Sequence, residues 1–433
     1  MYSINIWKGL KTSLKIAAQL RVAFFCVFKL KMGKAGECMR LKEYPRNVWI
    51  LAIGTFIYLT GLSFLWPLVT IYVVKVLGSS EAVAGGILFV YQGMGVLGSL
   101  LGGFLHDKMG GKKTVVIGSI CAAGMSLAFL LRSELLFFAL ILGLYGFFVN
   151  IVFPSLHAMA TEIWPEGGQK AFNLLYIFRN VGVAVGSALG GFLAQFSFTY
   201  VFIGIALVFV IFLFLIVLLV PNVRQAISPK EQHYQKIRKD QLIPIIVLCI
   251  GLSICWIVYV QWQTNISSYM ANLGFSLSEY SFLWTINGLV ILLFQPLLAW
   301  VIGKWQVALR AQLLLGVMLF IGSTLLISQV QFYVGFLLGM VILTWGEILV
   351  WTGVPAIAAQ LAPAGKLGRF QGFVESAGTF GRMLGPLIGG ILYEKFHSQI
   401  MLIIMSSFLV IPLVCFYVYQ KFQIPKTSEL SSK

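Results

Sequence analysis

Four charged side chains lie inside long apolar runs of this sequence, where charge is rare. Two are the glutamates Glu347 and Glu375, and two are the arginines Arg179 and Arg382. Burial in apolar surroundings raises the pKa of a carboxylic acid toward neutrality, so a glutamate placed there can take up and release protons. We therefore predict that these four residues couple protons, with Glu347 as the main proton site. The alternative is a structural ion pair or a hydrogen-bonded neutral acid, and the sequence does not choose which glutamate pairs with which arginine.

Several amide and aromatic side chains share the apolar runs and are candidates for lining a pocket. Aromatic faces bind cations, and an amide within an apolar run rarely faces lipid. The predicted pocket residues are Gln261, Trp262, Gln263, Asn287, Tyr145, Tyr259 and Trp345. Because most aromatic residues in such runs pack or anchor the chain at an interface, we expect only part of the aromatic set to face a pocket.

Cysteines and histidines are dispersed along the chain. The six cysteines and four histidines lack the close spacing that a metal site requires. No constellation of His, Asp or Cys indicates catalysis. We therefore expect neither an enzyme nor a bound metal or cofactor.

The composition excludes an ordinary water-soluble enzyme. Of the 433 residues, 59% are hydrophobic and 10% are charged, compared with about 45–50% and about 25% in soluble domains. The net charge of +17 lies mostly between the apolar runs. It is interpreted as loop charge of a membrane protein, and no nucleic-acid partner is expected.

Twelve apolar runs are long enough to cross a bilayer as helices, which takes roughly 20 residues each. They lie at 48–74, 83–106, 114–132, 135–160, 171–195, 200–220, 242–270, 280–303, 311–328, 332–361, 370–393 and 399–420. A basic break at 221–241 separates six runs from six. The predicted fold is an all-α membrane protein with two six-helix bundles, at 48–220 and 242–420, joined by a cytoplasmic linker and followed by a tail at 421–433.

Lysines and arginines concentrate in the loops on one side of the predicted membrane. The loops after even-numbered runs hold Lys108, Lys112, Lys113, Lys170, Lys304, Arg310, Lys366 and Arg369, whereas the opposite loops hold Lys75, Arg132 and Lys395. Basic residues are retained on the cytoplasmic side. We expect both termini in the cytoplasm and the basic loops close to anionic lipid headgroups.

Two interpretations stay open for residues 1–47, which are basic and apolar. The segment suits an amphipathic helix that lies on anionic lipid. Alternatively, translation starts at Met39, because Met39-Arg40-Leu41-Lys42 directly before the first run looks like a natural basic beginning. In that case residues 1–38 are not translated.

Glycines recur in one pattern in both halves. The pattern comprises Gly182, Gly186 and Gly190 in the fifth run and Gly381, Gly385, Pro386 and Gly389 in the eleventh, the glycines at one constant offset. Two homologous halves explain the repeat. We predict that these glycines allow close helix packing, and a moving gate contact is a compatible alternative.

The loop between the second and third runs has its own pattern. It reads Gly103-Phe104-Leu105-His106-Asp107-Lys108-Met109-Gly110-Gly111-Lys112-Lys113. A short turn needs glycine, and an aspartate stabilises the positive end of a helix. This loop resembles the signature of the major facilitator superfamily. The two six-run halves and the basic linker extend the resemblance over residues 45–420.

The resemblance implies transport by alternating access, with two bundles rocking around a central cavity. It also implies that Asp107 pairs with the start of the eleventh run and helps to close a cytoplasmic gate. The other gate-loop residues are Gly103, Lys108, Gly110, Lys112 and Lys113.

Three further stretches look like bacterial twelve-span drug:proton antiporters. They are Tyr259–Gln263, Gln295-Pro296 and Gly346-Glu347, although Ser187 follows Gly186 where those antiporters have proline. We predict a proton-coupled multidrug efflux transporter of the bacterial inner membrane, which expels small amphipathic molecules as a monomer. A proton-coupled symporter for a small metabolite or peptide is the alternative, and a non-transporting membrane sensor is the alternative from another class.

Overall fold

The computed structural model describes residues 44–221 and 237–422. The predicted amphipathic segment, the possible start at Met39, most of the linker and the tail beyond residue 422 lie outside the described residues. We refer below to residues 44–221 as the N-terminal half and to residues 237–422 as the C-terminal half.

Helices make up nearly all of both halves. The N-terminal half contains α2 (Arg46–Leu65), η2 (Trp66–Leu68), α3 (Val69–Lys75), α4 (Glu81–Met109), α5 (Gly111–Ala128), α6 (Leu135–Ile163), η3 (Pro165–Gly167), α7 (Gln169–Ala194) and α8 (Phe198–Leu219). The C-terminal half contains α10 (Lys239–Tyr259), η4 (Val260–Trp262), α11 (Asn265–Asn272), α12 (Leu277–Trp305), α13 (Leu309–Gln329), α14 (Tyr333–Leu361), α15 (Leu367–Phe408), α16 (Val410–Val418) and η5 (Tyr419–Phe422).

Every predicted apolar run falls on a helical segment. Within the described ranges, ten segments are long and apolar enough to cross a membrane. The third predicted run corresponds to α5, which is not among the ten, and the last two runs share the segment Leu367–Phe422. That segment breaks at His397, where φ is 60°. The all-α membrane fold is confirmed, and the count of twelve spans stays a prediction.

Local sequence sets several helix ends. The hydroxyl of Ser276 accepts a bond from the amide of Glu279, whose carboxylate accepts from the amide of Ser276, so the two residues form a capping box at the start of α12. Gly110 turns the chain between α4 and α5 with a φ of 90°. At the end of α8, Lys112 Nζ donates to the carbonyls of Val217 and Val220, each at 2.8 Å, where a cation complements the helix dipole.

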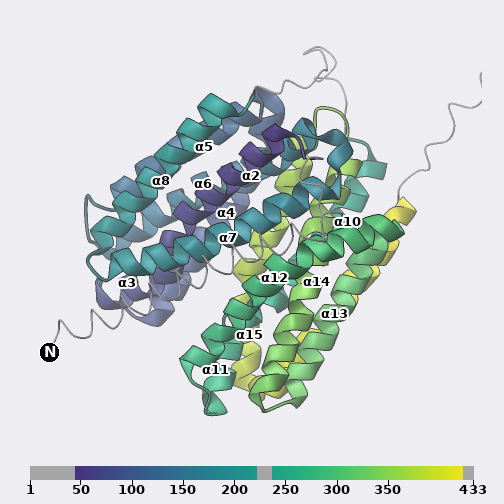
Figure 1. The fold of residues 1–433 in the computed structure, drawn as a ribbon. Helices are drawn as coiled ribbons and strands as arrows, with labels where there is room; N and C mark the ends of the chain where they lie inside the picture. The colour runs from purple at the N-terminus through teal and green to yellow at the C-terminus, as the bar shows by residue number, and fades with distance from the viewer. Residues whose placement is uncertain (1–43, 222–236, 423–433) are drawn as a thin grey trace, which may run out of the picture.

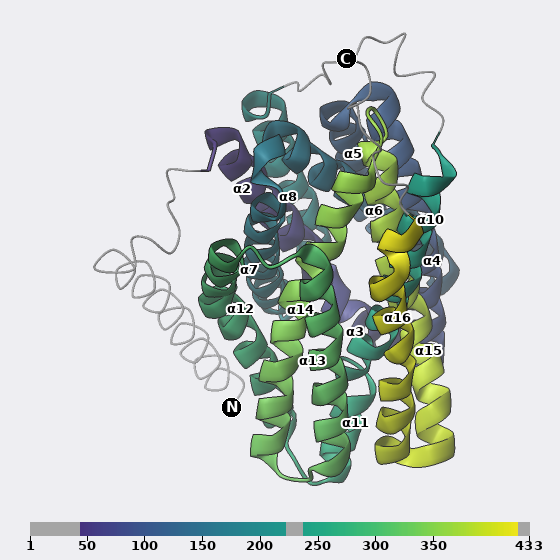
Figure 2. The ribbon, with the colours of Figure 1, turned by 90° about the vertical axis from the view of Figure 1, so that its right-hand side faces the viewer.

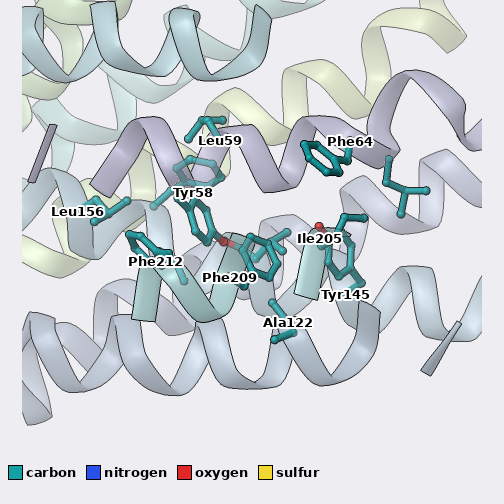
Figure 3. Packing of buried hydrophobic residues seen from close by; sticks show 14 of the residues in the cluster. Tyr58, Leu59, Phe64, Ala122, Tyr145, Leu156, Ile205, Phe209 and Phe212 are labelled. Atoms are coloured by element: carbon teal, nitrogen blue, oxygen red, sulfur yellow. The ribbon is translucent and has the colours of Figure 1, made fainter. Parts of the chain in front are cut away.

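Each half has its own hydrophobic core. One cluster of buried apolar residues draws only on 48–220 and a second only on 245–419. Figure 3 shows part of the first, in which Tyr58 stacks on Phe209 with ring centroids 5.2 Å apart. The hydroxyl of Tyr58 donates to the carbonyl of Val149 at 2.7 Å, so this polar group is satisfied inside the core.

The repeated glycines form matching packing stripes in the two halves. A Cβ on Gly182 would lie 2.5 Å from the carbonyl oxygen of Phe56, and one on Gly190 would lie 2.6 Å from the Cα atom of Phe64, so α7 approaches the backbone of α2. In the C-terminal half a Cβ on Gly381 would lie 2.6 Å from the Cβ atom of Trp256 on α10. Of the other members, Gly186 lies against the backbone of Thr60 on α2, Gly385 against the side chain of Val260 in η4, and Gly389 against the side chain of Gln261, whereas Pro386 is exposed.

The two halves meet along α4 and α15 and diverge toward α3 and α11, as Figure 1 shows. Figure 2 shows α13, α14, α15 and α16 lying with their axes roughly parallel in the C-terminal half. Glycines again permit the close approach: a Cβ on Gly368 would lie 2.6 Å from the carbonyl oxygen of Gly103, and one on Gly372 would lie 2.8 Å from that of Ser99. The interface between halves is therefore tight at the end where the Asp107 loop lies.

Candidate functional site

A cavity of about 240 Å³ lies between the two halves. Its walls come from α2, α6 and α7 on one side and from α10, α12, α14 and α15 on the other. All four predicted proton-coupling residues line it: Arg179, Glu347, Glu375 and Arg382. Ligand sites in transporters lie at such an interface between repeats, where polar groups from several helices converge.

Glu347 is held by neutral donors from both halves. Its Oε1 atom accepts a bond from the hydroxyl of Tyr176 on α7 at 2.6 Å, and its Oε2 atom accepts one from Nδ2 of Asn287 on α12 at 2.8 Å. The same Asn287 nitrogen lies 2.9 Å from Oγ1 of Thr344, which fixes the amide. Only 4% of Glu347 is exposed. The carboxyl group is therefore buried from bulk solvent, and both of its oxygens accept hydrogen bonds from neutral groups. It also lines the cavity.

Close packing of α13 on α14 supports the position of Glu347. A Cβ on the adjacent Gly346 would lie 2.7 Å from the carbonyl oxygen of Gly316. Gly346 therefore lies on the side of α14 that packs against α13, and the following residue, Glu347, faces the cavity between the halves. Trp351, one turn further along α14, lines the same cavity.

The second glutamate contacts a histidine of the other half. Nδ1 of His157 on α6 lies 3.1 Å from Oε1 of Glu375 on α15. Both side chains are largely buried, with exposed fractions of 14% and 9%. This contact joins the two halves.

The two arginines are stacked on aromatic rings. The guanidinium of Arg382 lies 4.5 Å from the ring centroid of Trp256 and donates from Nη2 to Oγ1 of Thr379 at 2.8 Å. The guanidinium of Arg179 lies 5.5 Å from the ring centroid of Phe153. Within 44–221 and 237–422, neither arginine has a carboxylate oxygen within 4 Å. The sequence left the partner of each arginine open, and the structure gives both arginines aromatic partners.

Aromatic rings cover one wall of the cavity. Trp256 of α10 and Trp351 of α14 stack with centroids 4.4 Å apart and ring planes 3° apart. Tyr259 packs edge-on against both of them, at 5.3 and 5.6 Å. This wall suits a flat apolar ligand or a cation.

Three of the predicted pocket residues line the cavity and four do not. Tyr259, Gln263 and Asn287 belong to the lining. Trp262 is a core residue of the C-terminal half, and Gln261 is buried with its amide donating to the carbonyls of Ile257 and Gly385. The prediction is corrected for both residues, because the amide of Gln261 makes its hydrogen bonds within the C-terminal half and the ring of Trp262 packs in the core of that half.

The remaining two predicted pocket residues are also absent from the cavity lining. Tyr145 is packed in the N-terminal core, where Figure 3 shows it beside Phe209. Trp345 is 41% exposed and contacts Phe294. Residues 345 and 347 are two positions apart on one helix and so point in nearly opposite directions. The presence of Glu347 in the cavity therefore directs Trp345 outward.

Sequence reasoning missed Tyr176 and His157. Tyr176 precedes Arg179 by three residues, so the two share a helix face, and this spacing was a usable signal. His157 lies in the apolar part of α6, and an ionisable residue in such a run is by itself an indicator of a functional site. The wide scatter of the four histidines along the sequence concealed this.

The gate-loop aspartate contacts the start of α15. Oδ1 of Asp107 accepts a bond from the amide of Gly368 at 2.7 Å, and Oδ2 accepts one from the amide of Arg369 at 3.2 Å. Nε of Arg369 lies 3.4 Å from Oδ2. A carboxylate at the first turn of a helix also interacts favourably with the helix dipole. This is the helix start at which the resemblance placed the partner of Asp107.

The other loop residues have separate positions. Gly103 faces Gly368, Gly110 makes the turn, and Lys112 caps α8 as described above. Lys108 and Lys113 are exposed. His106, which the sequence did not single out, lies with Nε2 3.0 Å from Glu162 at the end of α6. In the part of the chain that the structure describes, no group of three or more potential metal ligands occurs.

Comparison with known proteins identifies the family. The sequence model of the Major Facilitator Superfamily matches residues 51–329 and 263–432. The MFS-type transporter YttB of Bacillus subtilis (strain 168) is 43% identical, over 87% of this chain and 96% of that protein. The multidrug resistance protein MdtH of Shigella dysenteriae serotype 1 (strain Sd197) is 23% identical, over 84% of this chain and 89% of that protein.

A solved structure shows the same fold. The human organic anion transporter MFSD10 superposes with a TM-score of 0.71 at 15% identity, over 86% of this chain and 100% of that one. Helical architecture, the gate-loop contact and the family match agree, so this chain belongs to the Major Facilitator Superfamily of multi-pass membrane transporters and is not an enzyme.

Proposed function

We propose that this transporter exports small amphipathic molecules in exchange for protons, and that Glu347 carries the exchanged proton. The observation that carries the proposal is the position of Glu347, which lies in the cavity and is bonded to Tyr176 of the opposite half. A carboxyl group in this position can alternate between a proton and a cationic substrate. Its bond to the opposite half also makes its protonation sensitive to the movement of the halves.

The aromatic wall supports an amphipathic substrate. Trp256, Trp351 and Tyr259 give the cavity flat apolar surfaces beside its charged groups. The named relative MdtH is a multidrug resistance protein, which favours the same substrate class.

Alternating access is proposed from the tight contact between α4 and α15 and the divergence of the halves elsewhere. In this arrangement the Asp107 contact with Gly368 and Arg369 closes the end that carries the basic loops. We place that end and both termini in the cytoplasm of a bacterial inner membrane, because basic loops are retained there. The two bundles at 48–220 and 242–420 are the bodies that rock.

Ethidium transport tests the proposal. Everted vesicles containing the wild-type protein are expected to accumulate ethidium when a proton gradient is imposed. Vesicles with Glu347→Gln at equal protein abundance are expected to lose this accumulation, because glutamine keeps the hydrogen bonds to Tyr176 and Asn287 in part but binds no proton. Accumulation that is independent of the gradient, or that survives the substitution, would overturn the proposal.

A symporter is the second candidate, and the two arginines are the observation that favours it. A proton on Glu347 adds positive charge to a cavity that already contains Arg179 and Arg382, so an anionic substrate and a proton bind better together than separately. The direction of proton flow separates the candidates. In proteoliposomes, symport moves protons with the substrate, whereas antiport moves them against it.

A further inference from the structure

The cavity contains Glu347 and the two arginines as separate charges, whereas its second glutamate, Glu375, is contacted by His157. Both oxygens of Glu347 accept bonds from neutral groups, the hydroxyl of Tyr176 and the amide of Asn287. Arg382 bonds to Thr379 and stacks on Trp256. Arg179 lies over the ring of Phe153. Among the described residues, no carboxylate oxygen lies within 4 Å of either guanidinium.

Burying separate charges in this way costs free energy unless a ligand supplies the opposite charges. An ion removed from bulk water loses solvation energy, and an opposite charge at contact distance recovers part of this loss. Here the hydrogen-bonding groups hold Glu347 on α14 and the aromatic rings hold Arg382 on α15, so the opposite charges remain available to the cavity. A ligand with one positive and one negative group can pair with both at the same time.

We propose that the cavity binds amphoteric aromatic molecules, with the carboxylate of the ligand at Arg382 and Arg179 and its ammonium group at Glu347. A guanidinium presents parallel donors that match the two oxygens of a carboxylate. The stacked rings of Trp256 and Trp351 supply the surface for the aromatic body of the ligand.

The inference rests on the proposed function and makes its substrate class specific. The ammonium group and the exchanged proton compete for one carboxylate, which is the coupling that antiport requires. The arginines keep their charge throughout, so they recognise the carboxylate in both protonation states of Glu347.

Ligands that share a ring system and differ only in charge test the inference. The first set is tryptophan, tryptamine and indole-3-propionate. The second set places the charges farther apart: 4'-(aminomethyl)biphenyl-4-carboxylic acid, its carboxamide, which keeps only the ammonium group, and 4'-methylbiphenyl-4-carboxylic acid, which keeps only the carboxylate. Binding of all six to the full-length protein in detergent is measured by titration calorimetry.

In at least one set, the amphoteric compound is expected to bind about tenfold more tightly than either singly charged compound. Arg382→Gln is expected to reduce the affinity for the amphoteric compound to that of the cation, while the affinity for the cation stays unchanged. Glu347→Gln is expected to remove the contribution of the ammonium group and to leave binding of the carboxylate compound intact. Arg132→Gln, at an exposed loop position, is the matched control and should alter none of these values.

Equal affinities for the amphoteric and the cationic compound in both sets would overturn the inference. It is also overturned if Arg382→Gln weakens all compounds equally while Arg382→Lys restores all of them equally, since the arginine then serves only the fold.

Proton flux in proteoliposomes separates this failure from that of the proposed function. If tryptamine drives proton exchange that depends on Glu347 but the amphoteric preference is absent, the proposed function stands and the inference falls. If the amphoteric preference is present without any proton exchange, the binding site stands and the proposed function falls.

Discussion

The hydroxyl of Tyr176 on α7 donates a 2.6 Å hydrogen bond to the carboxyl group of Glu347 on α14, and so joins the two halves inside the cavity. The two residues are 171 positions apart in the chain. Any movement that separates the halves breaks this bond and changes the surroundings of Glu347. In the proposed mechanism this contact links the protonation of Glu347 to the arrangement of the two halves.

Tyr176→Phe should uncouple proton movement from substrate movement. The substitution keeps the ring and removes one donor, and a hydrogen bond to a charged group contributes about 1.5–3 kcal/mol. We expect substrate-driven proton flux in proteoliposomes to fall about tenfold or more. Tyr145→Phe is the matched control, because that buried hydroxyl lies in the N-terminal core without a hydrogen-bond partner in the described structure. Equal flux in the wild type and Tyr176→Phe would contradict the role of this bond.

Sequence reasoning located the helices and part of the cavity because both depend on local patterns. Apolar runs mark membrane helices. A charged side chain within such a run faces the protein interior or a cavity and avoids lipid, and Glu347, Glu375, Arg179 and Arg382 all line the cavity. The direction of each side chain follows from helix geometry, and neglect of that geometry gave the wrong expectation for Trp345.

The pairing of charges was beyond the sequence for a different reason. His157 meets Glu375 only because α6 and α15, from different halves, pack at the end where Gly103 faces Gly368. This contact depends on how two bodies dock, and no local pattern encodes that docking. The Asp107 contact was anticipated only through the resemblance to a family.

Asp107→Asn should favour opening of the contact between α4 and α15. The substitution removes the negative charge from the first turn of α15 and weakens bonds to Gly368 and Arg369. Loss of a charge-assisted bond of about 1.5–3 kcal/mol shifts an open-to-closed ratio roughly tenfold or more. Spin labels at the exposed positions Lys108 and Ala364 report the distance between the two helix ends.

The distance distribution should gain a longer component in Asp107→Asn. Lys113→Gln, at an exposed position of the same loop, is the control and should keep the wild-type distribution. An unchanged distribution in Asp107→Asn would show that glycine packing alone holds the closed end.

His157→Gln should weaken a link between the two halves. Nδ1 of His157 lies 3.1 Å from Oε1 of Glu375, so the contact joins α6 to α15 in the closed arrangement, and a glutamine at this position does not reproduce the imidazole geometry. Arg179, Arg382 and Glu347 line the same cavity and keep their side chains in both variants. The same spin labels, at Lys108 and Ala364, measure the closed fraction in the wild type and in His157→Gln.

In His157→Gln the closed fraction should be smaller than in the wild type, because the contact with Glu375 is weakened. His397→Gln is the matched control, because His397 is exposed at the break in α15. An unchanged closed fraction in His157→Gln would show that this contact does not stabilise the closed arrangement.

Gly186→Ala and Gly191→Ala should differ sharply in stability, although they are close on the same helix. A Cβ on Gly186 would meet the backbone of α2 at Thr60 and lie 2.9 Å from the Cβ atom of Ser63, whereas one on Gly191 would have no atom within 4 Å. Because backbone cannot move aside as a flexible side chain can, the first substitution should cost about 1–3 kcal/mol and the second should cost nothing. Thermal unfolding of the purified protein in detergent measures the difference.

The repeat makes the same prediction for the C-terminal half, where Gly385 and Gly390 occupy the corresponding positions. A Cβ on Gly385 would meet the β-branched side chain of Val260 and lie 3.2 Å from the Cα atom of Ile257 on α10, and one on Gly390 would have no atom within 4 Å. Gly385→Ala should therefore lower the unfolding temperature as Gly186→Ala does, and Gly390→Ala should not. If the unfolding temperature falls for only one of Gly186→Ala and Gly385→Ala, the glycines support helix packing in that half alone. The matching glycines of the other half would then serve a contact made in another transport state.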